Sequence, residues 1–460
     1  MIDLSKYKNT KIGVFGLGKT GSSTIKAFLK AGSLVYAWDD NKDKVLQLKS
    51  EINNDNLYLS DIIDPTDIKK LEFMIISPGI PGNFPKPHSI FLQCQRYTIP
   101  IESDIDLLQE FCKGSNFIGI TGTNGKSTTS SLIQHILSSN KIDSFLGGNI
   151  GIPVTDLPQN NSKNSHYITE ISSYQLELSD KLRFNIAILM NVTPDHLDRY
   201  KSFDDYYNTK KSVFNNQEIG DFSIISLNTK NNLDVFDSLV AKNKQKVIPI
   251  SSLEILKNGV SVLNKTIHDN YFDNKSYTFA PPISLFGTHN AENIAAAYVV
   301  AKILDVKIED IISSITSFAG LQNRTEVVLK TKNLIFVNDS KATNIDATIK
   351  ALDSFSSIYW IAGGVLKGQD VNKLSNHLKN VLHCFLIGDD GKKFIPMLNL
   401  NKKIYTHSET MEEALLFIKN SNISGTVLLS PACASFDQYN NYEERGKAFK
   451  NLVTKYFYDN

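Results

Sequence analysis

The sequence is poor in cysteine and has no long apolar run. Its 460 residues include four cysteines, which lie far apart and form no CxxC pair. This pattern excludes a disulfide scaffold and predicts reduced thiols. The longest apolar stretches, such as residues 184–192, are much shorter than the roughly 20 residues of a membrane helix. The first residues mix acids and bases without an apolar segment, so we expect no secretory signal, no membrane partner and a cytoplasmic location.

The sequence also lacks an excess of charge of either sign. Lys plus Arg number 49 and Asp plus Glu number 48, so the formal net charge of +1 indicates no nucleic-acid partner. The nine histidines include no HExxH pair, so any metal site must be assembled from distant segments. Hydrophobic residues make up 41% of the chain, which is ordinary for a folded protein of several domains.

Short apolar strands alternate with helix-like segments along the chain, which predicts an α/β fold with parallel sheets. We expect three domains: a Rossmann-like domain at 1–102, a central P-loop-type ATPase domain at 103–319 and a C-terminal Rossmann-like α/β domain at 320–460. The proline-rich stretch 78–87 and the polar stretches 53–56, 159–164 and 228–234 are predicted to be loops. A helix is expected at 291–304, and strands are expected at 11–15, 34–38, 73–76, 117–120, 168–172, 186–192, 334–337, 358–362, 384–387 and 427–429.

The first expected strand runs into a glycine loop. Gly16-x-Gly18-x-x-Gly21 opens a helix, and Asp39 follows the next strand. Glycines let the backbone approach a pyrophosphate, and a helix N-terminus offers N–H donors to it. The pattern is typical of an NAD-dependent dehydrogenase, but any diphosphate linked to a ribose would satisfy it. A tight turn without a ligand remains an alternative.

A second glycine loop, Gly122-x-x-Gly125-Lys126-Ser127-Thr128, also lies between a strand and a helix. Backbone N–H groups, a lysine and a hydroxyl at this spacing predict a nucleoside triphosphate with Mg²⁺. The loop departs from a strict Walker A motif because Ile120 occupies the position of the first glycine. A non-catalytic nucleotide-binding switch would also carry such a loop.

Acids and a histidine follow later strands of the same expected domain. Glu170 closes one strand, and Asp195, His196 and Asp198 follow another. Ligands bind at the carboxyl ends of parallel strands, so these groups and Lys126 form a candidate metal and phosphate site. For each residue alone, a surface carboxylate or a hydrogen-bonded histidine is the alternative.

The third domain carries two polar loops, 338–344 and 363–368, each after a strand. Their cations and hydroxyls could dock an anionic substrate, or each could be a capped polar loop. The last expected strand leads into 430–439, where Cys433 has no histidine motif tied to it. We therefore expect a buried thiol there and no nucleophile.

Taken together, these motifs resemble the Mur ligase family over nearly the whole chain. The resemblance is carried by residues 16–21, 77–79, 121–128, 148–151, 170–177, 191–198 and 289–293. Residues 338–344 and 430–438 resemble the members that add D-glutamate. The resemblance implies an ATP-dependent amide-forming ligase of peptidoglycan synthesis, which joins D-glutamate to UDP-N-acetylmuramoyl-L-alanine through an acyl phosphate. A sibling ligase that adds another amino acid is the alternative, and we expect a monomer.

The resemblance also implies roles for individual residues. The UDP substrate would contact Gly18, Lys19, Thr20, Asp39, Ser77, Asn149 and His196. ATP would contact Gly122, Thr123, Asn124, Gly125, Lys126, Ser127, Thr128, Asn290, Asn293, Arg324 and Asp339. D-glutamate would contact Lys341, Thr343, Lys367, Ser435 and Phe436. The metal ligands would be Ser127, Glu170, His196 and Lys210, and the catalytic set would be Lys126, Glu170, His196 and Lys210.

Lys210 matches the lysine that carries a carbamate in this family, with the adjacent Lys211 as the alternative. Lys210 stands four residues after Tyr206 and four before Phe214, a helical spacing that turns all three the same way. Two segments depart from the family pattern. Asn323-Arg324-Thr325 replaces a His-Arg-Phe sequence, and Val365-Leu366 replaces a more polar pair before Lys367.

Overall fold

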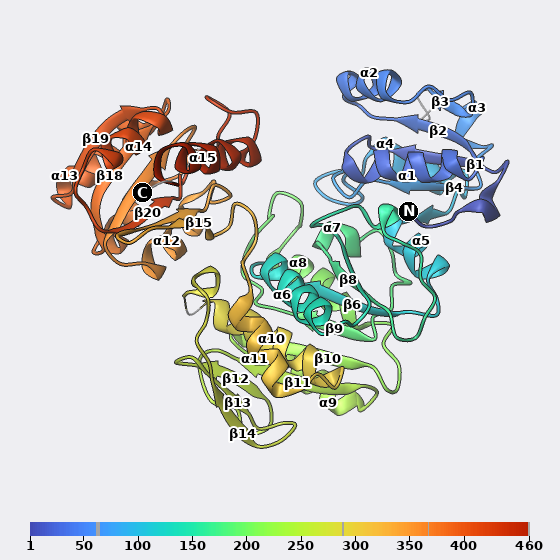
Figure 1. Ribbon diagram of the computed structural model, residues 1–460. Coiled ribbons are helices and arrows are strands. Elements are labelled where there is room, and N and C mark those ends of the chain that lie inside the picture. The colour runs from blue at the N-terminus through green and yellow to red at the C-terminus, as the bar shows by residue number, and fades with distance from the viewer. Residues whose placement is uncertain (61–64, 288, 367, 459–460) are drawn as a thin grey trace. The chain divides into compact units, whose positions relative to one another are not determined.

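The computed structural model describes residues 1–60, 65–287, 289–366 and 368–458 (Figure 1). The chain divides into two compact units, one formed by 1–277 and 292–311 and the other by 278–291 with 312 onward. Each of the three expected domains contains one sheet. The expected domain boundaries themselves remain predictions.

The first sheet has the strand order β3-β2-β1-β4-β5, and its paired strands are parallel. Apolar side chains of helix α1 (Lys19–Lys30) cover one face, and Ile90 and Cys94 of helix α4 (Ser89–Arg96) pack on the other. Because the chain leaves the central strand β1 where the strand order reverses, the first glycine loop lies at the position where such sheets bind ligands. The strands are β1 (Lys11–Phe15), β2 (Leu34–Trp38), β3 (Leu57–Leu59), β4 (Phe73–Ile76) and β5 (Ile101–Glu102).

The second sheet has the order β14-β13-β12-β11-β10-β9-β6-β8-β7. Its strands from β7 to β12 pair in parallel, and β12 pairs antiparallel with β13. The second glycine loop leaves β6, which lies between β8 and β9, so it also occupies a point where the strand order reverses. The strands are β6 (Asn116–Thr121), β7 (Ser144–Gly148), β8 (His166–Glu170), β9 (Ile186–Leu189), β10 (Phe222–Ser226), β11 (Lys246–Ser251), β12 (Val260–Leu263), β13 (Thr266–Asp269) and β14 (Lys275–Thr278).

The third sheet has the order β15-β16-β20-β17-β18-β19, with β15 antiparallel and the rest parallel. Helices cover both faces (Figure 1). Helices α14 (Met411–Lys419) and α15 (Tyr442–Phe457) pack with Phe336 and Ile361. Helices α12 (Ile345–Ser354) and α13 (Ile395–Leu400) pack with Trp360. The strands are β15 (Glu326–Lys330), β16 (Leu334–Asn338), β17 (Ile358–Gly363), β18 (Val381–Ile387), β19 (Ile404–Glu409) and β20 (Gly425–Leu429).

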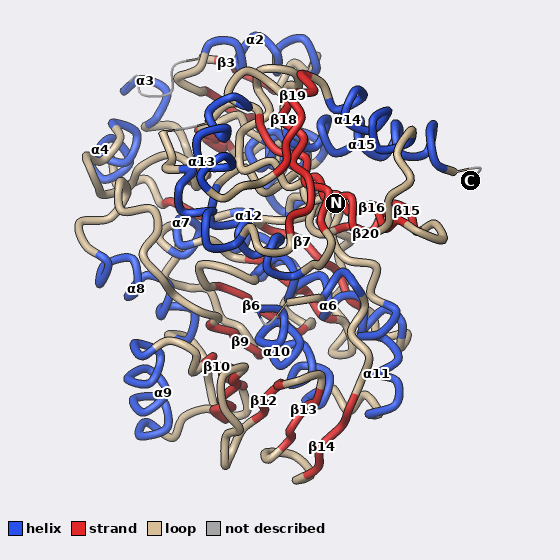
Figure 2. The backbone as a smooth tube through the Cα atoms, turned by 90° about the vertical axis from the view of Figure 1, so that its left-hand side faces the viewer, coloured by secondary structure: helices blue, strands red, loops and turns tan. Residues whose placement is uncertain are grey.

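The helices connect these strands (Figure 2). They are α1 (Lys19–Lys30), α2 (Lys42–Glu51), α3 (Pro65–Ile68), α4 (Ser89–Arg96), α5 (Asp104–Phe111), α6 (Lys126–Ser139), α7 (Ser173–Leu176), α8 (Phe203–Lys211), α9 (Lys230–Lys242), α10 (His289–Ile303), α11 (Ile308–Ser317), α12 (Ile345–Ser354), α13 (Ile395–Leu400), α14 (Met411–Lys419) and α15 (Tyr442–Phe457). Short 3₁₀ turns lie at η1 (Ser5–Tyr7), η2 (Val154–Asp156), η3 (Ser212–Phe214), η4 (Ile283–Leu285), η5 (Val371–His377) and η6 (Gly391–Phe394).

The structure corrects three details of the sequence prediction. The polar stretch 228–234 is not all loop, because α9 begins at Lys230 and turns the buried Asn232 toward the carbonyls of Met190 and Ser226. The strand expected at 168–172 is β8, which ends at Glu170 so that Ser172 can cap α7. The strand expected at 186–192 ends at Leu189. In the described part of the chain, no helix is long and apolar enough to cross a membrane.

Candidate active site

The second glycine loop is the structural centre of the site. Gly122 and Gly125 have φ values of +148° and +87°, and α6 begins at Lys126 directly after them. A Cβ on Gly125 would lie 2.3 Å from Asn293 Oδ1, so that position accepts only glycine without a shift. Asn293 Oδ1 also accepts a hydrogen bond from Thr129 Oγ1 at 3.1 Å. The start of α10 therefore holds the loop close to the helix N-terminus, where backbone N–H groups can meet a phosphate.

Two lysines converge on one carbonyl of this loop. Lys126 Nζ donates to Gly122 O and Thr123 O at 3.0 Å each, and Lys210 Nζ donates to Gly122 O at 2.8 Å. Lys210 is 2% exposed, and its Nζ also lies 4.8 Å from the ring centre of Tyr206. Helix α8 thus turns Tyr206 and Lys210 toward the loop, as their spacing predicts, whereas Lys211 is exposed.

The electrostatic environment of Lys210 disfavours its ammonium form. Burial, followed by the charge of Lys126, lowers the pKa of Lys210 to about 7, against the opposing effect of Asp195 and Glu170. A neutral amine is the form that reacts with CO₂ to give a carbamate, because the ammonium has no lone pair to offer. The site therefore contains a lysine whose amine is available for that reaction near neutral pH.

Glu170 ends β8 and is 2% exposed. Its Oε1 accepts a hydrogen bond from Asn149 Nδ2 at 2.9 Å, while its Oε2 is buried and has no hydrogen-bond partner among the described residues. A buried carboxylate oxygen without a partner costs free energy unless a cation or donor meets it. Asn149, expected at the UDP substrate, therefore lies beside the expected metal ligand Glu170.

His196 lies in the loop 191–198 and has a φ of +54°. Its side chain is about half exposed, lies 3.6 Å from the carboxylate of Asp195, and packs at 5.1 Å from the ring of Tyr174 and 6.3 Å from that of Tyr206. Tyr206 and Thr123 share a hydrogen bond of 3.1 Å, which links this aromatic cluster to the glycine loop. The structure thus brings His196 toward the elements that carry Lys126 and Lys210.

The first glycine loop is built differently. A Cβ on Gly21 would lie 1.9 Å from Gly16 O, so the close strand-to-helix turn requires glycine there. Gly18 caps α1, and Lys19 is exposed at the first helical position, where an anion can approach. Ser77 Oγ donates to Gly16 O at 2.8 Å. The expected UDP contacts Gly18, Lys19, Thr20 and Ser77 therefore gather at one turn.

Asp39 is 6% exposed and stabilises this same turn. Its carboxylate accepts hydrogen bonds from the N–H groups of Leu17 at 2.7 Å and Asn41 at 2.9 Å, and Lys44 Nζ lies 3.4 Å away. Burial acts to raise the pKa of Asp39, but these hydrogen bonds and the lysine outweigh it and lower the pKa below its usual value. The structural role of Asp39 is explicit, and its contact with uridine remains a prediction.

The second unit holds part of the expected ATP set. Asp339 is 7% exposed and accepts hydrogen bonds from Thr325 N at 3.2 Å and Ser430 Oγ at 2.8 Å. Burial raises the pKa of Asp339 to about 7, while Ser430, Thr325 and the charge of Arg324 act against that shift. Asn290 donates to Phe286 O at 2.9 Å within this unit. The adenine and ribose contacts of these residues remain predictions.

The residues expected at D-glutamate lie on loops that follow strands of the third sheet. Lys341 Nζ is 5.4 Å from the ring centre of Tyr442, and Thr343 N donates to Lys341 O. Ser435 is 2% exposed, whereas Phe436 is 65% exposed. Lys367 lies outside the described residues.

Some residues that shape these sites were missed by the sequence analysis. Glu292 accepts hydrogen bonds from the backbone and side-chain amides of Asn191, which in turn bonds to Asn124. Arg445 is buried beneath the loops of the third sheet. Glu292 and Asn191 lie inside quoted motifs, so the motif itself was the available signal. No sequence signal indicated that Arg445 is buried, because an arginine in a polar helix usually faces solvent.

The expected metal ligands include only two side chains of the acid and histidine types. Among the described residues, no group of three or more His, Cys, Asp or Glu side chains is placed to hold an ion. The expected set contains only Glu170 and His196 of these types. It would be completed by the Ser127 hydroxyl and a carbamate on Lys210.

Comparisons with known proteins point to one family. Residues 120–301 match a family model described as the Mur ligase middle domain. A UDP-N-acetylmuramoylalanine–D-glutamate ligase of Rickettsia bellii (strain RML369-C) is 36% identical over 97% of this chain and 98% of its own length. A ligase of the same description from Wolbachia pipientis wMel is 36% identical over 100% of this chain and 99% of its own length.

Solved structures share the fold at lower identity. A UDP-N-acetylmuramate-alanine ligase from Thermotoga maritima has a TM-score of 0.60 at 17% identity, covering 97% of this chain and 99% of that chain. A MurF ligase from the same organism, in complex with ADP, has a TM-score of 0.58 at 15% identity, covering 99% and 97%. These structures confirm the expected three-domain α/β fold class. The chain therefore belongs to the Mur ligase family, and its full length aligns with members described as UDP-N-acetylmuramoylalanine–D-glutamate ligases.

Proposed function

We propose that this chain joins D-glutamate to UDP-N-acetylmuramoyl-L-alanine, with cleavage of ATP to ADP and phosphate, in the cytoplasmic stage of peptidoglycan synthesis. The observation that carries the proposal is the convergence of Lys126 and Lys210 on Gly122 O, with the buried Glu170 close enough for its charge to act on Lys210. The full-length similarity to D-glutamate ligases supports the choice of substrates. We retain the expectation that the enzyme acts as a monomer.

The chemistry must activate a carboxylate, which is a poor electrophile. In the first step an oxygen of the L-alanine carboxylate attacks the γ-phosphorus of ATP, the bond to the β-γ bridging oxygen breaks, and ADP leaves. The amine of D-glutamate then attacks the carbonyl carbon of the acyl phosphate, loses a proton and expels phosphate, so that an amide forms. Lys126 lies at the N-terminus of α6, where its charge offsets the repulsion between the carboxylate and the triphosphate.

The residues of the site fit a divalent cation. The buried Glu170 Oε2, without a partner among the described residues, is an oxygen suited to Mg²⁺. Ser127, Glu170, His196 and a carbamate on Lys210 would hold Mg²⁺, which when bound supplies positive charge to the phosphates. The low pKa of Lys210 supports the carbamate, since it makes the neutral amine accessible.

The two remaining substrates are assigned to the other domains. The exposed N-terminus of α1 and the turn held by Ser77 suit the diphosphate of the UDP substrate. Lys341, Thr343, Lys367 and Ser435 provide cationic and hydroxyl groups for a dicarboxylic amino acid. Closure of such a site would exclude water, which would otherwise hydrolyse the acyl phosphate.

The proposal is tested by ADP release with a panel of amino acids and by the mass of the product. D-glutamate should support ADP release and give a product whose mass equals that of the UDP substrate plus one glutamate residue. ADP release with a different amino acid would indicate a sibling ligase. ADP formation without any amino acid would indicate a nucleotide-binding switch, and NAD binding at the first loop would indicate a dehydrogenase.

A further inference from the structure

Arg445 is a buried cation that takes no part in the reaction steps proposed above. It lies in the first turns of α15 and is 1% exposed. It has no ion pair with a carboxylate among the described residues. Burial lowers the pKa of Arg445 to about 10, so the guanidinium stays charged at neutral pH. A buried charge without a counterion is costly, which indicates that the position serves more than packing.

The side chain of Arg445 joins loops that are distant in sequence. Its Nε donates to Ser340 Oγ at 3.0 Å, and its Nη2 donates to Ser340 O at 2.9 Å and Cys433 O at 3.0 Å. Its Nη1 is buried without a hydrogen-bond partner in the described part of the chain, and it would lie 3.3 Å from a Cβ on Gly364. The guanidinium therefore touches the loops after β16, β17 and β20.

These three loops carry the residues assigned to the amino acid. Lys341 and Thr343 follow Ser340 directly, Ser435 follows Cys433 by two positions, and Lys367 follows Gly364 by three. Two backbone hydrogen bonds of 2.9 Å between Val365 and Ala434 fasten two of the loops to each other. Ser340 Oγ donates to Tyr442 O at 2.9 Å, which ties the remaining loop to the start of α15.

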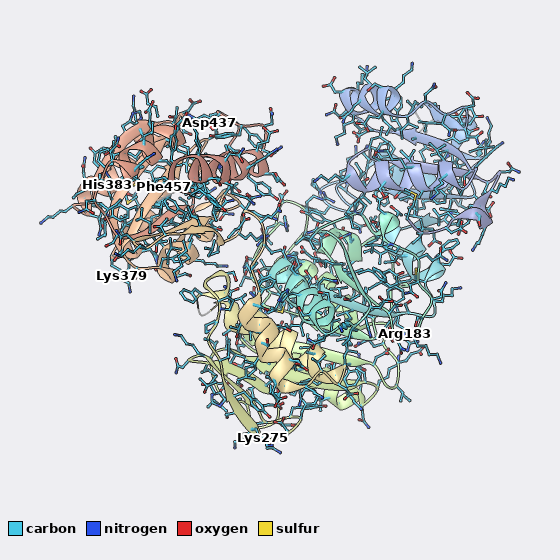
Figure 3. The ribbon with its side chains drawn as sticks, viewed as in Figure 1. Arg183, Lys275, Lys379, His383, Asp437 and Phe457 are labelled. Carbon is cyan, nitrogen blue, oxygen red and sulfur yellow. The ribbon has the colours of Figure 1, made fainter. Side chains whose placement is uncertain are left out.

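The charge of Asp437 acts on Arg445, but the two side chains form no ion pair in the described part of the chain. Asp437, labelled in Figure 3, accepts a hydrogen bond from Asp389 N at 3.1 Å. Asp390 accepts one from Leu366 N at 2.7 Å and pairs with Lys393. The charge of Arg445 is therefore offset only in part, by Asp437 and not by an ion pair within the described residues, and it contributes a positive potential beneath the three loops.

We propose that Arg445 is the positioning residue of the amino-acid site: it fixes the three loops relative to one another, and its charge, which no ion pair cancels within the described residues, favours a substrate with a second carboxylate. This inference rests on the proposed function, because it assumes that the amino acid binds at these loops. Arg445 acts through the loops and does not touch the reacting atoms.

The experiment compares R445Q, R445K and the control K447Q, which removes an exposed positive charge two residues further along the same helix. For each variant, ADP release gives the KM for D-glutamate, ATP and the UDP substrate, and the ratio of kcat/KM for D-glutamate to that for D-glutamine. We expect R445Q to raise the KM for D-glutamate by about tenfold or more and to reduce the D-glutamate preference by a similar factor. The KM values for ATP and the UDP substrate should stay within about twofold, which separates this role from general stabilisation.

R445K separates the two parts of the role. It keeps the charge but cannot bridge Ser340 and Cys433 at once, so we expect a raised KM for D-glutamate with most of the D-glutamate preference retained. K447Q should match the wild type. If R445Q does not fold, as judged by its thermal melt, R445K and S340A carry the test, and S340A should raise the KM for D-glutamate alone.

Two results would overturn the inference. One is a folded R445Q with an unchanged KM for D-glutamate and an unchanged preference over D-glutamine. The other is an equal rise in all three KM values in R445K and S340A, which would reveal a structural role only. Absence of D-glutamate-dependent ADP release in the wild type would instead count against the proposed function, before any variant is compared.

Discussion

The two glycine loops use the same backbone device and surround it with different side chains. Both follow a strand that is paired in parallel on each side, at a point where the strand order reverses, and both open a helix, α1 in one case and α6 in the other. At the first loop the nearby acid, Asp39, is fully engaged with backbone N–H groups and Lys44. At the second loop the acid, Glu170, keeps one buried oxygen without a partner in the described chain, and two lysines meet at one carbonyl.

We propose that this difference separates a loop that binds a phosphate from a loop at which a phosphate is transferred. At the first loop the acid already accepts hydrogen bonds and the lysine is exposed, so the loop can bind a diphosphate but offers no free carboxylate oxygen to a metal ion. A loop with a buried carboxylate oxygen, a lysine of low pKa and a second lysine has the groups to gather a cation and stabilise charge that develops in a reaction. Changes at the second loop should therefore affect rate, and changes at the first should affect binding.

The largest effect is expected from Lys126→Ala. Removing the charge at the second loop should lower the rate of ADP formation by about a thousandfold or more, because the developing phosphate charge loses its main offset. Binding of the UDP substrate, measured by titration calorimetry, should change little. If a Lys126→Ala variant with a normal thermal melt lost both ADP formation and binding of the UDP substrate, the two loops would not have the separate roles proposed here.

Lys210→Ala should come next, with a loss of about a hundredfold in kcat. A short carboxylate such as formate should restore part of the activity by replacing the carbamate. Lys211→Ala is the matched control and should keep normal activity, because Lys211 is exposed. Normal activity of Lys210→Ala in CO₂-free buffer would refute the carbamate.

The pH dependence of the wild type gives a second test of Lys210. The carbamate forms from the neutral amine, and the pKa of Lys210 is lowered to about 7. As the pH falls below that value the amine becomes protonated, so activity should fall and added CO₂ should restore it only in part. The rate is measured between about pH 6 and pH 8, roughly one unit on either side of the pKa of Lys210. A rate that changes neither with pH in this range nor with CO₂ would contradict this expectation.

At the first loop, Lys19→Ala should raise the KM for the UDP substrate by about tenfold while kcat stays near the wild-type value. Lys26→Ala, on the same helix but away from its N-terminus, is the control and should change neither constant. A large fall in kcat for Lys19→Ala would show that the first loop takes part in the chemistry.

The smallest effect is expected from Asp39→Asn, which should lower the free energy of unfolding by about 1–2 kcal/mol through weaker hydrogen bonds to Leu17 and Asn41. The pKa of Asp39 is lowered in the folded state, so its contribution is fully present above the unfolded pKa of about 3.9 and is lost as pH falls through the folded pKa. Urea unfolding of Asp39→Asn and wild type at neutral and acidic pH, with the exposed Asp55→Asn as the control, measures this contribution. If the free energies of unfolding of Asp39→Asn and wild type differed by the same amount at both pH values, the lowered pKa of Asp39 would be contradicted.

The sequence predicted the elements that depend on local pattern. The strands β1, β2 and β4 have the predicted bounds because short apolar runs end at glycine or polar residues there. Helix α9 was partly missed because Asn232 is polar yet buried, and its amide bonds to carbonyls of β10 and the segment after β9. The antiparallel strands β13 and β15 were not among the expected strands, although the run Val327-Val328-Leu329 in β15 has the β-branched residues that are typical of a strand.

The candidate site was predictable only in its parts. The motif at 121–128 identified Lys126, and helical spacing turned Lys210 toward the same side as Tyr206. That both amines donate to Gly122 O depends on the packing of α8 against the loop, which no local pattern encodes. The burial and contacts of Arg445 could not be predicted for the same reason, because its hydrogen bonds reach Ser340, which lies more than 100 residues earlier in the chain.

The most direct test of the proposed phosphate transfer to the carboxylate follows an oxygen atom. The L-alanine carboxylate of UDP-N-acetylmuramoyl-L-alanine is labelled with a heavy oxygen isotope and incubated with ATP, D-glutamate and the enzyme. If the carboxylate attacks the γ-phosphorus, one labelled oxygen must leave with the released phosphate, and mass spectrometry should find it there. Formation of the amide product with unlabelled phosphate would contradict the account.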